Sequence, residues 1–522
     1  MNLKSKLAAR AEKTHSLIRL SILGLLTFIA NHAFAQTEKG ALEFTVQDKA
    51  TRKEVACRIH LTDNRGKSQR ADPLPFFRDH FVCSGNAQLR LPAGSYTFEI
   101  ERGPEYLPRS GSADVRANAT NKVAVQLERL VDMADEGWWS GELHVHRPLQ
   151  DIELLMQAED LHVAPVISWW NNQNQWANQK PPDPLLVKFD NNRLFHVMGG
   201  EDEREGGALL FFNLPHPLPI TGADREFPSP MTFVEQARKE QNVWIDIEKP
   251  FWWDVPIWLA SGEVDSIGIA NNHMCRSQMY ENEAWGKPRD AHRLPAPRGN
   301  GLWTQEIYYQ ILNCGLRIPP SAGSASGVLP NPVGYNRVYV FLGKDFNYEN
   351  WWQSLRAGRS FVSNGPLLRC RANGEVPGQI FTVAQGKALR VELEASLSSP
   401  DPISSIEVVK NGRVELKVPF EDWKQTGELG TLSFTQSGWF LVRALTDNPK
   451  TFRFASTAPY YVEIGDTKRR ISRASAQFFL DWVRERAQRV KLDDPVKRAA
   501  VLQYHEKAEK YWQDIVAKAN AE

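Results

Sequence analysis

Short apolar segments that run straight into polar or aromatic residues recur between residues 131 and 345. HVAPVI is followed by SWWNNQ, LFHVMG by GEDERE, VWIDI by EKPFWWD, VDSIGIA by NNHMCR and CGLRI by PPSAGSAS. Longer, partly helical segments separate them. Strands whose carboxyl ends open into functional groups are typical of a β/α barrel, because loops at those ends build its active site. We therefore expect a central β/α barrel over residues 131–372.

The two flanking regions alternate in the β period. Segments such as ALEFTVQD and SYTFEI predict a β-sandwich over residues 37–130, and IEVVKNGRVELKV, with Asn411-Gly412 in a hairpin turn, predicts a second one over 373–466. Residues 467–522 read as a helical tail, with a helix start at Asp494-Pro495. The expected fold is therefore multidomain α/β plus all-β, with a barrel between two sandwiches.

The N-terminus resembles an export signal. A basic leader precedes an apolar run at 20–30, and Ala33-Phe34-Ala35 offers small residues for cleavage, so residues 1–35 are predicted to be a signal peptide. An uncleaved anchor is the alternative. We expect a periplasmic or secreted protein without stable membrane insertion after signal removal. The net charge of +1 gives no reason to expect a nucleic-acid partner.

Five cysteines are present, and none shows the CxxC spacing of a zinc site. Cys57 and Cys83 each lie in a predicted strand of the first sandwich. An exported chain permits disulfides, so this pair is a disulfide candidate.

The segment GELHVHRP carries the strongest chemical signal. His144 and His146 are two residues apart in a predicted strand, so their imidazoles face the same side. Two imidazoles on one face can bind a divalent metal such as zinc, manganese or iron. An exposed strand face with alternating polar residues is the competing interpretation.

Carboxylates support the metal interpretation. In WIDIEKP, Asp246 and Glu248 share one strand face, and burying unpaired charge is costly unless a cation compensates it. Glu201 and His273 end two further predicted strands. We predict one divalent ion held by His144, His146, Glu201, Glu248 and His273, with Asp246 as general base. Ion pairs of Asp246 and Glu248 with Lys249 or Arg317 are the alternative.

Tryptophan is frequent, with 17 residues, several in doublets next to the candidate ligands. Either these rings pack in the core or they line a cleft suited to sugar rings or aryl groups. The predicted substrate-binding residues are Trp169, Trp170, Trp252, Trp253, Arg276 and Arg317, the arginines (or Lys249) holding a polar or anionic group.

GWWSGELHVHRP resembles the opening motif of the PHP-type metal-dependent hydrolases, and among them the exported CehA/McbA group. GGEDEREGGALLFFNL, IDIEKPFWW, LRIPPSAGSASG and LRAGRSFVSNGPLL resemble later segments of that family, over about residues 130–370. The resemblance implies a PHP-like barrel beside a carboxypeptidase-regulatory-like or Ig-like domain. It carries over His144, His146 and Glu201 as metal ligands. Other family ligands are replaced, for example by Ala325 and Gly327, so a single ion is expected.

Together these features predict an exported hydrolase in which metal-activated water attacks an ester, amide, carbamate or phosphoester bond of a small-molecule or glycan substrate. The rival hypothesis is a catalytically degenerate carbohydrate-binding protein of the periplasm or cell surface. It rests on the replaced ligands and the tryptophans.

Overall fold

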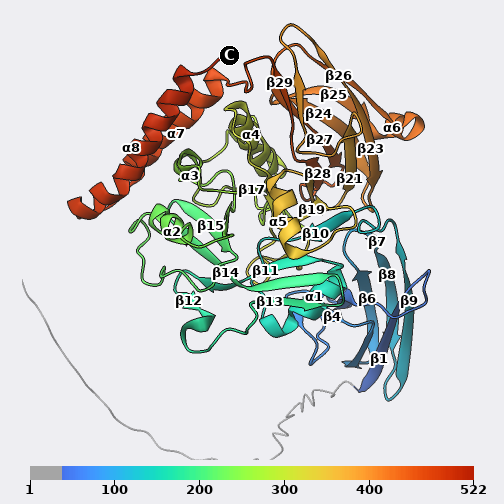
Figure 1. Cartoon of the computed structure of the whole chain (residues 1–522). Helices are drawn as coiled ribbons and strands as arrows, with labels where there is room; N and C mark the ends of the chain where they lie inside the picture. The colour runs from blue at the N-terminus through green and yellow to red at the C-terminus, as the bar shows by residue number, and fades with distance from the viewer. Residues whose placement is uncertain (1–37) are drawn as a thin grey trace, which may run out of the picture. The chain divides into compact units, whose positions relative to one another are not determined.

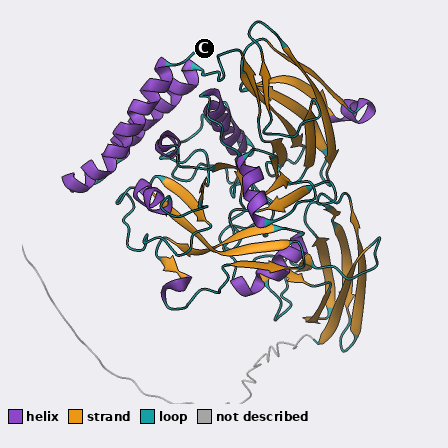
Figure 2. Cartoon of the chain, in the orientation of Figure 1, coloured by secondary structure: helices purple, strands orange, loops and turns teal. Residues whose placement is uncertain are grey.

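The computed structural model describes residues 38–522, and Lys39–Glu522 form one compact unit. The predicted signal peptide, residues 1–35, lies outside the described residues. Among the helices that the structure describes, none has both the length and the apolar character needed to cross a bilayer. Strands account for most of the regular structure (Figure 2).

The N-terminal region consists of two sheets around a shared core. The first contains β5 (Asn86–Pro92), β1 (Lys39–Asp48), β9 (Thr120–Arg129) and β7 (Tyr106–Leu107), and the second contains β3 (Phe76–Phe77), β4 (His80–Cys83), β2 (Cys57–Asp63), β6 (Gly94–Glu101) and β8 (Arg109–Val115). Alternate residues of β1 and β5 are buried, as the period of two requires. Cys57 and Cys83 pair across β2 and β4 as free thiols with their Sγ atoms 3.7 Å apart, so the disulfide stays a prediction.

The central region builds its sheet from strands interrupted by short helices. Its strands are β10 (Trp138–Gly141), β11 (Val163–Trp170), β12 (Gln173–Asn174), β13 (Leu186–Phe189), β14 (Arg193–Arg204), β15 (Gly207–Phe212), β16 (Trp244–Ile247), β17 (Ser266–Ala270), β18 (Pro320–Ala322) and β19 (Arg337–Phe341). Its helices are α1 (Ile152–Glu159), α2 (Pro230–Ala237), α3 (Val255–Ser261), α4 (Gly299–Asn313) and α5 (Tyr348–Arg356). β15 is buried on both faces, which explains its continuous apolar sequence, and β16 is equally buried although it contains Asp246.

The prediction of a central PHP-like β/α barrel in an α/β chain is wrong. β14 pairs antiparallel with β15, β15 with β16, and β10 with β19, whereas a β/α barrel needs parallel strands joined through helices. No α-helix lies in the described segment between β11 and β14, and only residues 205 and 206 separate β14 from β15. The sequence interpretation failed because the pattern used to predict the barrel, an apolar strand followed by polar residues, also occurs in β-hairpins. The region is a mixed, mostly β structure.

Several parallel pairs remain within this sheet, and they position the candidate site. β10 pairs in parallel with β11, β11 with β14, β16 with β17, and β17 with β18. Beyond β10, Val145 forms parallel bridges to Val166 and to Ser326. The carboxyl ends of these strands therefore meet at one edge, where polar residues follow each strand.

Most of the C-terminal strands continue the same sheet, and the strands at residues 367–372, 389–398 and 428–434 form a separate three-stranded sheet. The C-terminal strands are β20 (Ser360–Ser363), β21 (Leu367–Ala372), β22 (Ile380–Val383), β23 (Leu389–Ser398), β24 (Ile403–Lys410), β25 (Arg413–Pro419), β26 (Glu428–Phe434), β27 (Gly438–Thr446), β28 (Phe454–Thr457) and β29 (Tyr460–Ile464), with α6 (Phe420–Thr426) between β25 and β26. β20 pairs with both β19 and β28, so the sheet crosses the boundary predicted at 372. The predicted hairpin is confirmed: Asn411 and Gly412, both at positive φ, join β24 to β25.

Two long helices end the chain, α7 (Arg473–Arg489) and α8 (Pro495–Ala517), and they lie side by side (Figure 1). The predicted helix start is confirmed, because the Asp494 side chain accepts from the backbone N–H groups of Val496 and Lys497. Trp512 is buried and its Nε1 donates to the carbonyl of Pro256, 2.9 Å away. The helices therefore pack on the central region through α3.

Candidate metal centre

His144 and His146 project from an extended segment that follows β10. Leu143 and Val145, on the opposite face, are fully buried in the apolar core. The two imidazoles meet on the other face, with their Nε2 atoms 3.0 Å apart. The alternation inferred from the sequence therefore holds locally, and a common face is confirmed for both histidines.

Glu201 completes a three-residue cluster. It lies in β14, next to β11, and its Oε2 atom is 3.4 Å from His144 Nε2 and 3.1 Å from His146 Nε2. This oxygen is buried and has no hydrogen-bond partner among the described residues. Burial acts to raise the pKa of Glu201, but the two histidines outweigh it and hold the pKa below its ordinary value. An unsatisfied buried carboxylate oxygen needs a cation or a donor.

The spacing of these three atoms fits a small divalent ion. Ligands about 2.0–2.2 Å from a tetrahedral zinc lie roughly 3.3–3.6 Å from one another, close to the spacings of this cluster. Two imidazole nitrogens and one carboxylate oxygen form a donor set that zinc, manganese and iron all accept. The three residues therefore fit a single divalent ion, held by three of the five predicted ligands.

Glu248 lies beside the cluster rather than in it. Its Oε1 atom is 3.4 Å from His144 Nδ1, the ring nitrogen that faces away from His146. The same carboxylate accepts hydrogen bonds from Lys249 Nζ, from Trp252 Nε1 at 2.8 Å and from Asn272 Nδ2 at 2.6 Å. A carboxylate on the distal nitrogen of a ligating histidine fixes the orientation of its ring. Glu248 is thus placed to orient His144.

The structure does not bring Asp246 and His273 to the common point. The Asp246 carboxylate accepts from the hydroxyls of Ser266 and Ser321, and burial raises its pKa to about 7. His273 Nδ1 lies 3.1 Å from the carbonyl of Asn282, and burial holds its pKa well below the ordinary value. Among described residues only His144, His146 and Glu201 converge here.

Sequence reasoning missed Glu203 as a member of this site. It follows Glu201 by two residues on β14, so both side chains face the same way. Burial, with the charges of Glu201 and Glu248, raises the pKa of Glu203 to about 7. The signal was present in the alternating acidic residues of GEDERE. A carboxylic acid that titrates near neutral pH beside a metal cluster is a candidate for proton transfer.

The four predicted tryptophans divide between the site and the core. Trp170 is half-buried, and its ring centroid lies 4.9 Å from that of His146. Trp169 packs on Phe211, and Trp252 hydrogen-bonds Glu248. Trp253 is buried, and Arg489 Cζ lies 4.1 Å from the centroid of the Trp253 ring. Only Trp170 is thus partly exposed beside the cluster.

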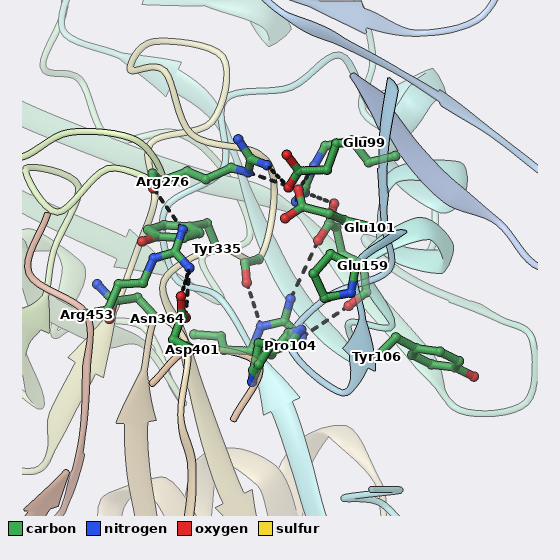
Figure 3. A pocket seen from close by; sticks show the side chains of 17 residues that line it. Glu99, Glu101, Pro104, Tyr106, Glu159, Arg276, Tyr335, Asn364, Asp401 and Arg453 are labelled. Atoms are coloured by element: carbon green, nitrogen blue, oxygen red, sulfur yellow. Dashed lines mark hydrogen bonds and ion pairs between the residues drawn. The ribbon is translucent and has the colours of Figure 1, made fainter. Parts of the chain in front are cut away.

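The two predicted arginines are engaged elsewhere. Arg317 donates to Glu463 of β29 at 2.7 Å. Arg276 donates to Glu99 and Glu101 of β6, in a cavity of about 200 Å³ that Figure 3 shows. Arg453 and Asp401 form another ion pair in that cavity, 2.8 Å apart. The acids and arginines of this cavity pair with each other, and none of the three cluster residues lines it.

Backbone packing fixes the two histidines closely. The buried Glu142 carboxylate accepts from the backbone N–H groups of Ser324 (2.6 Å) and Gly334, and so ties the loop after β18 to this segment. A Cβ atom on Gly323 would lie 2.4 Å from His144 Cβ, and one on Gly327 would lie 2.3 Å from the His146 carbonyl oxygen. The glycines therefore allow the loop to pack directly on both histidines.

A second His/Asp group lies in the N-terminal sheets and was not anticipated. Asp79 Oδ1 is 2.8 Å from His80 Nδ1, and Asp79 Oδ2 is 3.3 Å from His60 Nδ1. His60 Nε2 accepts from Arg58 Nε at 3.1 Å, which leaves the proton on His60 Nδ1 to be donated to Asp79. Hydrogen bonds therefore account for this cluster.

Comparisons with known proteins identify no family. No protein-family model matches the chain, and no curated protein matches it. Among solved structures, extracellular domains 3–5 of Drosophila OTK align at TM-score 0.12 and 7% identity, covering 82% of this chain and 92% of that one. The N-terminal four Ig domains of Dscam1 isoform 4.4 align at TM-score 0.13 and 11% identity, covering 82% of this chain and 100% of that one.

Proposed function

We propose that the chain is an exported metal-dependent hydrolase. The observation that carries the proposal is the convergence of His144 Nε2, His146 Nε2 and Glu201 Oε2 within 3.4 Å of one another, with no protein donor for the buried glutamate oxygen among the described residues. The resemblance of GELHVHRP to the CehA/McbA group supports the same reaction class. The leader at residues 1–35 supports export to the periplasm or the medium.

In the proposed reaction, different residues around the cluster bind the metal, accept a proton and line the site. A divalent ion held by His144, His146 and Glu201 would lower the pKa of a coordinated water and polarise the scissile bond. Glu203 accepts a proton near neutral pH, since its pKa is about 7. Asp246 is less suited to this role, because two serine hydroxyls already donate to its carboxylate. Trp170, half-buried against His146, forms an aromatic wall at the partly exposed side.

Metal analysis with a substrate panel tests the proposal. The purified mature chain is expected to contain about one equivalent of zinc, manganese or iron, and to hydrolyse at least one chromogenic ester, carbamate or phosphoester in a chelator-sensitive way. His144→Ala combined with His146→Ala should lose both the metal and the activity. His505→Ala, which removes a buried histidine of α8, is the matched control and should keep both.

Two results would contradict the proposal. One is stoichiometric metal retained by the double variant, which would place the ion elsewhere. The other is a metal-loaded chain that turns over no member of the panel while Glu203→Gln leaves every property unchanged. N-terminal sequencing of the exported product tests cleavage after Ala35 separately.

A further inference from the structure

A second cavity lies at the opposite end of the strands that carry the metal cluster. It has a volume of about 350 Å³, within the range of small-molecule sites. His196, near the start of β14, and Trp244, at the start of β16, both line it. Glu201 is five residues further along β14, so about 16 Å of strand separates the cavity from the cluster.

Aromatic rings form one wall of this cavity. Tyr348 and Trp352, on one face of α5, lie with ring centroids 6.0 Å apart. The Tyr348 ring runs nearly parallel to that of His196, at an interplanar angle of 13°. Trp244 packs against Trp352 from behind, with ring centroids 4.9 Å apart. Trp244 and Trp352 are buried, so the half-buried Tyr348 ring is the part of this wall that can contact the C–H face of a ring-shaped ligand.

Two ring N–H groups in this cavity have no well-aligned acceptor among the described residues, although Trp352 lies next to the Tyr348 hydroxyl. Trp352 Nε1 is buried and meets no acceptor in hydrogen-bond geometry within the described residues. The neighbouring Tyr348 hydroxyl donates instead to Asn213 Oδ1, 2.7 Å away. His196 Nδ1 accepts from the backbone N–H of Met198, which leaves the proton on Nε2. The cavity therefore needs acceptor oxygens from a ligand or from water.

The cavity contains one paired arginine and one carboxylate that has no ion-pair partner among the described residues. Arg356 pairs with Asp265 and lies 4.8 Å above the Trp244 ring. Glu349 accepts from Gln353 Nε2 at 3.0 Å. Glu349 is exposed at the rim, where its carboxylate can accept hydrogen bonds from ligand hydroxyl groups and disfavours an anionic ligand. Aromatic faces, amides and unsatisfied N–H donors together match a neutral polyhydroxylated ring.

We propose that the cavity lined by His196, Trp352, Tyr348 and Asn242 is a carbohydrate-binding site for a neutral sugar ring, separate from the metal cluster. A site of this kind anchors the protein to a glycan independently of hydrolysis. It does not rest on the proposed hydrolase function, because none of the three cluster residues takes part in it.

Ligand-observed NMR and tryptophan fluorescence titrations of the mature chain test this site. The probes are cellobiose, maltose and chitobiose, with benzoate and indole as non-sugar probes. At least one disaccharide should bind saturably, with chelator present or absent. Trp352→Phe should weaken that binding about 3- to 10-fold, the usual worth of one hydrogen bond. Trp258→Phe is the matched control, because Trp258 Nε1 is also buried and unpartnered within the described residues but lies outside the cavity.

Two further variants test whether sugar binding depends on this cavity and not on the metal cluster. Asn242→Gly removes an exposed side chain at the rim and keeps the positive φ of 60° at this position, so it tests the site without disturbing the core. His144→Ala combined with His146→Ala should bind the sugar as the unaltered chain does, even if all metal is lost. The proposal is overturned if no disaccharide binds, if benzoate or indole binds instead, or if Trp258→Phe weakens binding as much as Trp352→Phe.

Discussion

His144 Nε2 and His146 Nε2 lie 3.0 Å apart in a buried setting. Without a metal, one of these nitrogens can donate a proton to the other, whereas a shared cation would satisfy both lone pairs together with the Glu201 oxygen. Metal binding should therefore stabilise the fold. At a free ion concentration of a thousand times the Kd, the free energy of unfolding rises by about 4 kcal/mol.

Chelation should accordingly lower the Tm of the metal-loaded chain, as measured by differential scanning fluorimetry, and re-addition of zinc or manganese should restore it. Glu201→Gln removes one charged ligand and should abolish most of this response, whereas Glu240→Gln, on the surface, should preserve it. An identical chelator response in Glu201→Gln and the unaltered chain would show that the ion binds elsewhere.

Gly323 tests whether the loop after β18 positions the cluster. An added methyl group would lie 2.4 Å from His144 Cβ, so Gly323→Ala must displace the histidine or the loop. We expect metal affinity, measured by chelator competition, to fall by at least about tenfold. Gly365→Ala, where the nearest atom is a side-chain oxygen of Asp401 at 3.1 Å, is the control and should keep full affinity. Unchanged affinity in a folded Gly323→Ala chain would contradict the assigned packing.

The histidine pair of the cluster was predictable from the sequence because its geometry is local. Strand alternation alone places His144 and His146 on one face, and the polar end of β14 supplies Glu201. The roles of Glu248 and His273 were not predictable, because they depend on which ring nitrogen Glu248 meets and on how the loop after β17 turns. The barrel prediction failed for a related reason. Apolar segments reveal strands, but the antiparallel direction of β15 relative to β14 depends on a two-residue connection.

Glu105 should make stability depend on pH between about 4 and 7. Its carboxylate is buried and accepts from Met133 N at 3.0 Å and from the Tyr339 hydroxyl at 3.1 Å. Burial, aided by the charge of Asp160, raises its pKa to about 7. The folded state then binds the proton more tightly than the unfolded state, in which the pKa is about 4.3. The stabilisation is therefore complete below pH 4 and is lost as the pH rises through 7.

Urea unfolding across this pH range measures the effect. Glu105→Gln cannot ionise, so its free energy of unfolding should fall less between pH 4 and 7 than that of the unaltered chain. Glu240→Gln, which alters an exposed carboxylate, should follow the unaltered chain. Parallel curves for Glu105→Gln and the unaltered chain would exclude Glu105 as the titrating group.

Arg486 should be the strongest single electrostatic contact between α7 and the central region. It is buried and donates to Asp254 Oδ1 at 2.6 Å and to both oxygens of Glu226. Asp254 in turn donates its backbone N–H to the Gly206 carbonyl at 2.9 Å, in the turn between β14 and β15.

Arg486→Ala leaves two buried carboxylates without a counter-charge, so the free energy of unfolding should fall by about 3–5 kcal/mol. Arg484→Ala, also on α7, removes a mostly exposed pair with Glu509 of α8 and should cost no more than about 1 kcal/mol. Equal losses in the two variants, measured by urea unfolding at neutral pH, would show that the buried network does not hold α7 against the turn between β14 and β15.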